Sequence, residues 1–189
     1  MVSKPKEAEW AMNKLDAKTI AVMAVMIAVV TVFTMAVRVP IPATNGYINF
    51  SDVAIYFASF AFGPWVGLIA GGVGAGLADV MGGYANFAIL TFFAHGLEGF
   101  VAGYLGGRTN SLGRMLLGWA AGMVVMVAVY FLGETFVMGM GAAAAGTELP
   151  FNLVQNVAGA LIGIPLVYLV RRAYPPINQI GFGKTWKEV

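Results

Sequence analysis

The stretch IAVMAVMIAVVTVFTMAV, residues 20–37, contains no charged residue and only two polar ones. It is apolar and long enough to cross a bilayer as an α-helix, which needs roughly 20 such residues. It ends before Arg38 and Pro40-Ile41-Pro42, because proline cannot continue a helix. The sequence therefore predicts an all-α integral membrane protein. Five further apolar stretches complete a predicted set of six transmembrane helices, at about 51–62, 65–81, 86–105, 112–137 and 152–170.

The composition agrees with a membrane protein. Of the 189 residues, 59% are hydrophobic and only 11% are charged, whereas a soluble domain has about 25% charged residues. There is no cysteine, which excludes disulfides and thiolate metal sites, and His95 is the single histidine. The net charge of +2 is too small to indicate nucleic-acid binding. We therefore expect no metal site, no cofactor and no nucleic-acid partner.

The basic residues are distributed unevenly between the two sides of the predicted bundle. If the N-terminus is inside, Arg38 is the only one of the 11 Lys and Arg residues in an outer loop. Cytoplasmic segments are enriched in Lys and Arg, so we expect both termini in the cytoplasm and a multi-pass protein of the cell (plasma) membrane. The expected organisation is a cytoplasmic amphipathic segment at 1–19, a six-helix transmembrane domain at 20–172 and a cytoplasmic tail at 173–189.

Glycines recur four residues apart within the predicted helices, as at Gly67 and Gly71. Small residues at this spacing let membrane helices approach closely, so we assign these glycines to packing. Two long outer connections, at 38–50 and 138–150, are predicted to be mobile loops that could close over an external site.

Polar residues gather in the outer half of the predicted bundle. Ionisable groups inside a membrane are costly, so each is a candidate functional residue. Their one-sided distribution favours a binding pocket that is open to the outside and sealed below. Thr91, His95 and Glu98 share one face of a helix by their spacing. The predicted substrate-binding residues are Asn49, Asp79, Tyr84, Thr91, His95, Glu98, Tyr130, Glu134, Asn152, Gln155 and Asn156.

Simpler roles remain open for several of these ionisable groups. Asp52 could cap the helix that starts beside it. Asp79 could reach water at the interface, and Glu134 could be solvated at the outer end of its helix. His95 and Glu98 could form a structural pair between helices.

The chemistry of the predicted pocket narrows the ligand. The pocket offers carboxylates, amides, aromatic rings and one histidine, and the only cation outside is Arg38. A strongly anionic ligand would need Arg or Lys partners, so a neutral or cationic ligand is favoured. Amide and carboxyl groups suit a heteroaromatic ring that carries nitrogen and hydroxyl groups, with Tyr47, Tyr84, Phe92 or Tyr130 stacking on the ring.

Two stretches resemble a known family. They are GYINFSDVAIYFASFAFGPWVGLIAGGVGAGLADVMGG, residues 46–83, and FFAHGLEGFVAGYLGG, residues 92–107. The pattern is similar to the S components of energy-coupling factor (ECF) transporters, small membrane subunits that capture vitamins. Within that family it resembles the riboflavin/hydroxymethylpyrimidine branch. The resemblance implies six helices with a vitamin site near the outer face.

The resemblance also implies partners. S components work in an ABC-type importer with an ECF membrane subunit and two ATPase subunits, and the loaded S component topples in the membrane when ATP is hydrolysed. An Ala-x-x-x-Ala motif in the first helix typically forms the docking surface. Ala24 and Ala28 match this motif, with Ala21 one turn earlier. The chain has no Walker A sequence, so hydrolysis would fall to the partners, and we expect no enzymatic activity.

The substrate expected from this resemblance is a pyrimidine or pyridine vitamin or precursor: hydroxymethylpyrimidine, thiamine or pyridoxine, with riboflavin close behind. Anionic vitamins suit the predicted pocket poorly. Metal-binding S components carry a histidine next to the first methionine, where this chain has Val2. Three alternatives remain. They are a structural or assembly membrane protein of similar topology, an intramembrane enzyme with His95 and Glu98 as acid and base, and a proton-coupled carrier with Glu98 as its proton site.

Overall fold

The computed structural model describes residues 17–180. The chain forms helices joined by mostly short connections, together with one two-stranded hairpin. The predicted segments at 1–19 and 173–189 lie largely outside the described residues. The elements are α1 (Ala17–Ala36), β1 (Arg38–Ile41), β2 (Gly46–Asn49), α2 (Ser51–Phe62), α3 (Pro64–Gly82), α4 (Ala88–Gly106), α5 (Leu112–Leu132), the π-helical turn η1 (Gly133–Val137), α6 (Ala142–Gly146), α7 (Leu149–Ala173) and the 3₁₀ turn η2 (Pro175–Gln179).

The six predicted helices are present as α1 to α5 and α7, with ends within a few residues of those expected. Five segments are long and apolar enough to cross a membrane: α1, α3, α4, α5 with η1, and α6 with α7. With 12 residues, α2 rises about 18 Å, which is less than the roughly 30 Å of a bilayer core. The predicted crossing at 51–62 is therefore a short helix rather than a full span.

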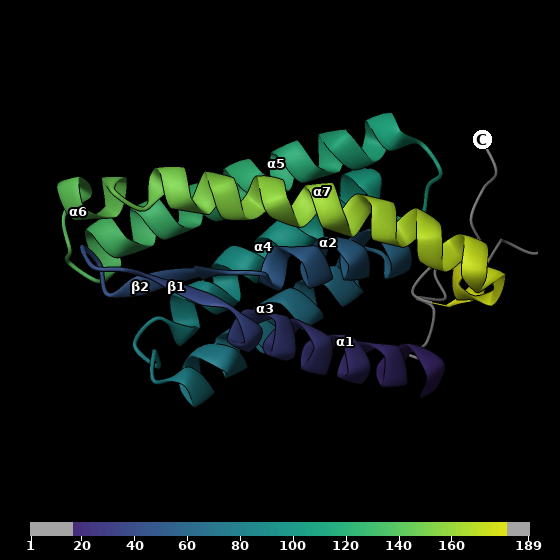
Figure 1. Cartoon of the computed structure of the whole chain (residues 1–189), viewed down its shortest axis with the longest axis horizontal. Coiled ribbons are helices and arrows are strands. Elements are labelled where there is room, and N and C mark those ends of the chain that lie inside the picture. Colours follow the sequence, from purple (N-terminus) through teal and green to yellow (C-terminus); the bar gives the residue numbers. More distant parts are fainter. Residues whose placement is uncertain (1–16, 181–189) are drawn as a thin grey trace, which may run out of the picture.

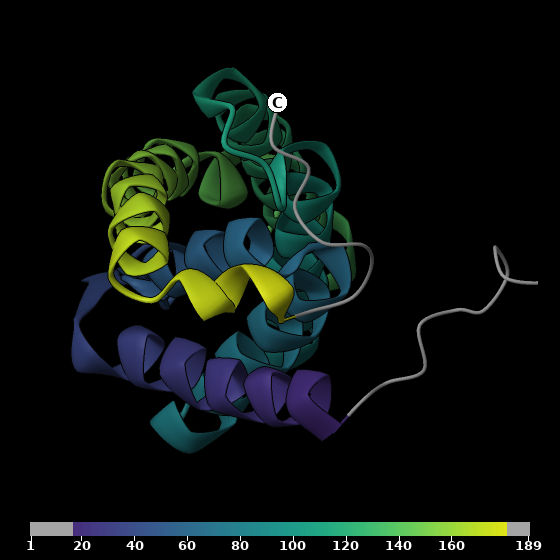
Figure 2. The same cartoon turned by 90° about the vertical axis from the view of Figure 1, so that its right-hand side faces the viewer.

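The axes of the long helices are roughly aligned, and the helices form an elongated bundle (Figure 1). α1 begins and α7 ends at one end of the bundle, whereas the hairpin and α6 lie at the other end. α2 lies inside, packed against α1, α3, α4 and α7 (Figure 2). Every residue of α2 except Phe57 is buried, so α2 is the central helix. Which end of the bundle faces the cytoplasm remains a prediction from the basic residues.

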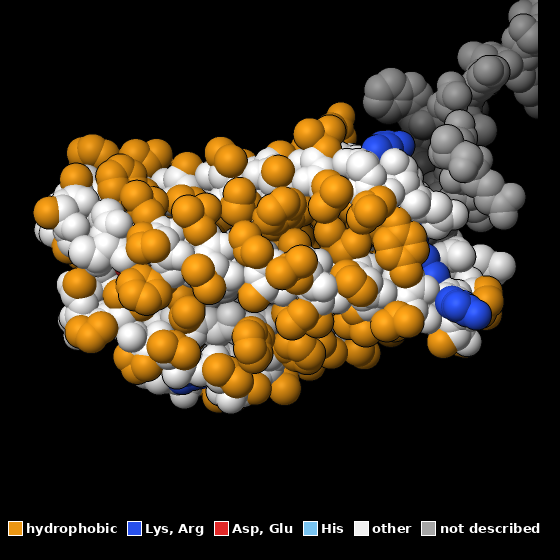
Figure 3. All heavy atoms as spheres, turned by 45° about the horizontal axis from the view of Figure 1, so that its top comes forward, with side chains coloured by type: hydrophobic (Ala, Val, Ile, Leu, Met, Phe, Trp, Pro, Cys, Tyr) orange, Lys and Arg blue, Asp and Glu red, His pale blue; other side chains and the backbone are white. Residues whose placement is uncertain are grey.

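The outer surface of the bundle is apolar. Ile89 is 75% exposed and Leu161 is 71% exposed, and exposed apolar surface on this scale is unusual for a soluble monomer. Figure 3 shows hydrophobic side chains over nearly all of one face, with Lys and Arg side chains mainly towards one end. Every acidic side chain among residues 17–180 is buried. Apolar groups thus face outward and acidic groups inward, as a lipid environment requires.

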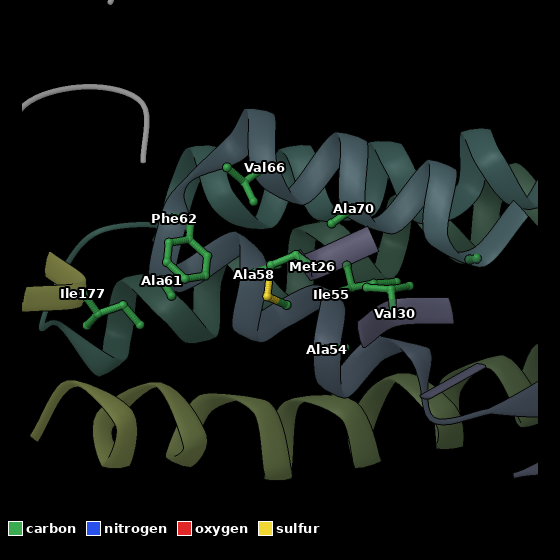
Figure 4. Packing of buried hydrophobic residues seen from close by; sticks show 11 residues of the cluster. Met26, Val30, Ala54, Ile55, Ala58, Ala61, Phe62, Val66, Ala70 and Ile177 are labelled. Atoms are coloured by element: carbon green, nitrogen blue, oxygen red, sulfur yellow. The ribbon is translucent and has the colours of Figure 1, made fainter. Parts of the chain in front are cut away.

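An apolar core fills the space between α1, α2 and α3. Met26 and Val30 of α1 pack against Ile55 of α2 (Figure 4), and these side chains are at most 4% exposed. This contact uses one face of α2 for packing. Asp52 and Tyr56 are one turn apart and lie on another face of the same helix. That second face is therefore free to carry polar groups.

α3 and α4 approach each other closely enough for their backbones to touch. A Cβ atom on Gly67 would lie 2.5 Å from the carbonyl oxygen of Gly99, and one on Gly71 would lie 2.5 Å from that of His95. A larger side chain at either position would push the helices apart. The glycine spacing is thus explained by packing, and this packing places His95 at the centre of the bundle.

The outer connection at 38–50 is an ordered antiparallel hairpin rather than the predicted mobile loop. The two strands pair along their length, and Ile41 lies opposite Gly46 at the turn. The second outer connection, at 138–150, contains α6 and the start of α7. Backbone hydrogen bonds that the sequence pattern did not reveal therefore give both connections regular structure.

Candidate functional site

Glu98 lies at the centre of a buried polar network that joins three helices. Its Oε1 atom is 2.6 Å from Nδ2 of Asn156 on α7 and 2.7 Å from the hydroxyl oxygen of Tyr56 on α2. Its Oε2 atom is 2.7 Å from Nδ1 of His95 on α4. All four side chains are at most 1% exposed. A polar group can be buried in this way only when it has hydrogen-bond partners, and the network supplies them.

Asp52 extends this network towards the start of α2. Its Oδ1 atom accepts hydrogen bonds from Nε2 of Gln155 at 3.1 Å and from Oγ of Ser51 at 3.0 Å. The same atom is 3.4 Å from Nδ1 of His95. No side chain caps the N-terminus of α2, although Oδ1 of Asn49 accepts a bond from the backbone N–H of Ser51. The capping role considered for Asp52 is therefore wrong.

Asp52, His95 and Glu98 offer potential metal-ligand atoms within 4.8 Å of one another, the one such group in the described part of the chain. Nδ1 of His95 is already in hydrogen-bond contact with Glu98, and amide groups donate to both carboxylates. The three residues thus belong to one hydrogen-bond network, in which Oδ2 of Asp52 has no partner within residues 17–180. His95 and Glu98 form a pair within α4 rather than between helices.

A narrow cleft lies beside this network, at the hairpin end of the bundle. β2 forms one wall, and α1, α3, α4, α5 and the start of α7 provide the rest. His95 belongs both to the network and to the cleft, so a ligand in the cleft would contact the network directly. The lining residues are Thr34, Gly46, Tyr47, Asn49, Asp79, Phe87, Thr91, His95, Tyr130, Glu148, Asn152 and Gln155.

Tyr47 links the hairpin to α3 by a hydrogen bond inside the cleft. Its hydroxyl donates a hydrogen bond of 2.5 Å to Oδ1 of Asp79. Burial, together with the nearby Asp79 carboxylate, raises the pKa of Tyr47, so this hydroxyl keeps its proton and remains a donor. The guanidinium of Arg38 lies 5.1 Å from the ring centroid of Tyr47 and 5.8 Å from that of Tyr84. Arg38 thus interacts with aromatic faces and does not line the cleft.

Asp79 and Glu134 are both shielded from water. Asp79 is 2% exposed and Glu134 is fully buried, so the alternative in which either carboxyl group is solvated at the interface is wrong. Oδ2 of Asp79 has no hydrogen-bond partner within residues 17–180. A buried acceptor without a donor is unusual in a folded protein. Because Asp79 lines the cleft, a donor group on a ligand could satisfy it.

The structure brings together most of the predicted substrate-binding residues. Four of them lie outside the cleft wall: Glu98 and Asn156 lie in the network, Tyr84 packs against Tyr47 with ring centroids 4.4 Å apart, and Glu134 is buried in η1. The predicted residues that line the cleft are Asn49, Asp79, Thr91, His95, Tyr130, Asn152 and Gln155.

Glu148 and Thr34 line the cleft but were missed by the sequence analysis. Glu148 lies in the stretch at 138–150 that was predicted to be a loop, so nothing in its surroundings indicated burial. Thr34 lies on α1, whose apolar pattern conceals which face is turned inward. Tyr47 was expected only as one of several stacking side chains. Only the three-dimensional arrangement shows that these residues share a cavity.

These features define an integral membrane protein with a polar cleft at one end of a helical bundle. More particularly, the chain belongs to the family of S components of ECF-type riboflavin transporters, whose family model matches residues 14–172. The resemblance seen in the sequence is therefore confirmed. Members of this family are transporter subunits, so the chain is not an enzyme, and the alternative in which His95 and Glu98 act as acid and base is wrong.

Relatives and solved structures agree with this assignment. The chain is 44% identical over 150 residues to an uncharacterised protein of Pyrococcus woesei, covering 79% of this chain and 99% of that protein. It is 32% identical over 162 residues to the thiamine precursor transporter HmpT of Lactococcus lactis subsp. cremoris, covering 85% and 92% of the two chains.

The fold is similar to two solved structures. One is the S component of a bacterial ECF transporter, with a TM-score of 0.67 and 22% identity, covering 82% of this chain and 96% of that one. The other is FolT bound with folic acid, with a TM-score of 0.59 and 19% identity, covering 92% and 100% of the two chains. At these identities the likeness concerns the fold alone.

Proposed function

We propose that this chain captures a small nitrogen heterocycle of the hydroxymethylpyrimidine type at the outer face of the membrane. It would then deliver this ligand inward as the S component of an ECF-type importer. The observation that carries the proposal is the 32% identity to HmpT, a thiamine precursor transporter, over 85% of this chain. The cleft between the hairpin and the helices is the proposed binding site.

The chemistry of the cleft suits such a ligand. Asp79 and Glu148 supply carboxylate acceptors, and Asn152 and Gln155 supply amides. An aminopyrimidine has N–H groups for the former and ring nitrogens for the latter. No Lys or Arg side chain of residues 17–180 lines the cleft, so a ligand with a strong negative charge would lack the partners it needs. Rings such as that of Tyr130 could stack on a flat heterocycle.

A docking surface for the ECF membrane subunit is proposed on α1. Ala21, Ala24 and Ala28 are all exposed on the outside of the bundle. They follow one another at intervals of three and four residues, so they share one face of the helix. Small residues on a helix face allow a partner helix to approach closely in a membrane. The resemblance to S components implies two ATPase subunits as further partners, and these would supply the ATP hydrolysis for which this chain has no Walker A sequence.

Riboflavin is the second candidate ligand. The family whose model matches residues 14–172 is named for riboflavin transport, and riboflavin also presents a flat nitrogen heterocycle. The cleft chemistry does not separate it from a pyrimidine. Direct binding must therefore decide between the two.

A thermal-shift screen of the purified protein tests the proposal. The panel contains hydroxymethylpyrimidine, thiamine, pyridoxine, riboflavin and folate. A ligand at a thousandfold excess over its Kd stabilises the folded state by about 4 kcal/mol, which raises the melting temperature clearly. We expect the largest increase with hydroxymethylpyrimidine. An increase only with riboflavin would replace the proposed ligand, and no increase with any compound from folded protein would contradict vitamin capture.

A further inference from the structure

The cleft has more acidic groups than basic ones. Asp79 and Glu148 both line it, and neither side chain is more than 4% exposed. Within the described residues, His95 is the only lining side chain that can carry a positive charge. Its Nδ1 atom is 2.7 Å from Oε2 of Glu98 and 3.4 Å from Oδ1 of Asp52. A charge on His95 would therefore be balanced by these two carboxyl groups and not by those that line the cleft.

Arg38, the only basic residue of the hairpin, does not balance the cleft either. Its guanidinium nitrogens lie 3.4 Å from the carbonyl oxygens of Ala78 and Gly82, near the C-terminal end of α3, and its charge faces the ring of Tyr47. It forms no ion pair with a carboxyl group in the described part of the chain. The Lys and Arg side chains visible in Figure 3 lie mainly at the opposite end of the bundle. The positive charge that would balance the cleft must come from elsewhere.

The carboxyl group of Asp79 offers one oxygen to a ligand. Oδ1 accepts a hydrogen bond of 2.5 Å from the hydroxyl of Tyr47, whereas Oδ2 is buried and has no hydrogen-bond partner in the described part of the chain. Glu148 differs, because its Oε1 atom already accepts a hydrogen bond from the hydroxyl of Thr44. A buried carboxylate oxygen without a donor is costly. A donor that also carries a positive charge would satisfy both needs of Asp79.

We propose that the cleft binds its ligand as a cation, with Oδ2 of Asp79 as the direct acceptor and Glu148 as a second negative charge nearby. This inference rests on the proposed function and deepens it, because it assigns a charge to the bound heterocycle. An aminopyrimidine becomes a cation when a ring nitrogen takes a proton from water, and the same ring nitrogen is then an N–H donor. A pyridinium or thiazolium ring carries its charge permanently.

The burial of Asp79 makes the charge of the ligand important for affinity. The attraction between a cation and a carboxylate is much stronger in a medium of low dielectric constant than in water. A ligand cation loses hydration when it enters the cleft, but Asp79 has already lost its own during folding, since it is 2% exposed. Only one of the two partners is therefore desolvated on binding, which favours a net gain from the ion pair.

Three small ring compounds of similar size test this proposal near neutral pH. 4-Aminopyridine is a cation with a ring N–H group. 4-Pyridone has the same ring N–H group but is neutral. 1-Methyl-4-aminopyridinium keeps the charge and lacks the ring N–H group. Each is titrated by calorimetry into the purified protein in lipid nanodiscs, with empty nanodiscs as the blank. A melting curve verifies that every variant is folded.

We expect the wild-type protein to bind 4-aminopyridine about tenfold more tightly than 4-pyridone, or better. The affinity for 1-methyl-4-aminopyridinium should lie between the two, because the charge remains and the hydrogen bond is lost. In Asp79→Asn, the preference for 4-aminopyridine over 4-pyridone should disappear. Tyr47→Phe is the matched control, since it breaks the contact at Oδ1 but keeps the carboxylate. It should retain the preference, whereas a purely structural role of this contact would make the two variants alike.

Three results would overturn the inference. The first is equal affinity of the wild-type protein for 4-aminopyridine and 4-pyridone. The second is a preference for the cation that persists in Asp79→Asn. The third is the absence of 4-aminopyridine binding by folded protein that binds hydroxymethylpyrimidine. Each of these results leaves vitamin capture intact, because capture is judged by the thermal-shift screen, so failure of the inference is distinct from failure of the proposed function.

Discussion

Nδ2 of Asn156 lies 2.6 Å from Oε1 of Glu98, although the two residues are 58 positions apart in the sequence. This contact joins α7 to α4 in the interior of the bundle. Because Glu98 also contacts His95, which lines the cleft, the shape of the cleft depends on the network.

Glu98→Gln should weaken ligand binding by at least about tenfold, equivalent to about 1.4 kcal/mol. The change replaces one acceptor oxygen by an N–H group, which cannot accept the bonds from Tyr56 or Asn156 or face a protonated Nδ1 of His95. The protein should remain folded, because the volume of the side chain is unchanged. A titration of the variant with the ligand found in the thermal-shift screen measures the effect. Wild-type affinity in this variant would show that Glu98 does not support the binding site.

Gly159→Ala should lower both the melting temperature and ligand affinity. A Cβ atom at this position would lie 2.4 Å from Cβ of Asp52, so α7 and α2 must separate. Overpacking of this kind costs about 1–3 kcal/mol. Gly146→Ala is the matched control, because a Cβ atom there meets nothing within 4 Å. Equal melting temperatures for the two variants would show that this helix contact is not tight.

Asp79→Asn should weaken binding more than Tyr47→Phe. The first change alters the acceptor Oδ2, which has no partner within residues 17–180 and is therefore available to the ligand. The second removes only the hydrogen bond between the hairpin and Oδ1 of Asp79. A charged hydrogen bond contributes about 1.5–3 kcal/mol, so we expect a tenfold or greater loss for Asp79→Asn. Titration of both variants tests this order, and the reverse order would place the ligand away from Asp79.

Ala24→Trp should leave ligand binding intact and abolish uptake in cells that also produce the ECF membrane subunit and the ATPases. The bulky ring would occupy the proposed docking face of α1, which lies outside the cleft. Leu161→Trp is the control, because Leu161 is 71% exposed on α7 and lies outside this face. Uptake should persist in the control. If Ala24→Trp impaired binding and uptake equally, the docking role would be lost.

The helices could be predicted from the sequence because lipid imposes a strong constraint. A span must be long and apolar, and this pattern located α1, α3, α4 and α5 to within a few residues. The same rule wrongly predicted that α2 crosses the membrane, because a short helix buried among other helices is as apolar as a membrane-spanning one. The hairpin escaped prediction because its pairing depends on contacts with α3 and α7 that local sequence does not encode.

The candidate site could be predicted in part. Asp79 and His95 were identified because a polar group within an apolar helix is costly and therefore conspicuous. Glu148 was not, because a carboxylate in a connecting segment is normally solvated. Thr91 and Glu98 share one face of α4 by their spacing, so the sequence could not show that Thr91 lines the cleft whereas Glu98 lies beneath it. That distinction depends on where α2 and α7 lie against α4.

An equilibrium titration of the purified wild-type protein with hydroxymethylpyrimidine, with riboflavin titrated in parallel, tests directly whether the chain captures a pyrimidine vitamin precursor. We expect saturable binding of one hydroxymethylpyrimidine per chain, at a lower Kd than that of riboflavin. Tighter binding of riboflavin, or no binding of hydroxymethylpyrimidine by folded protein, would contradict it.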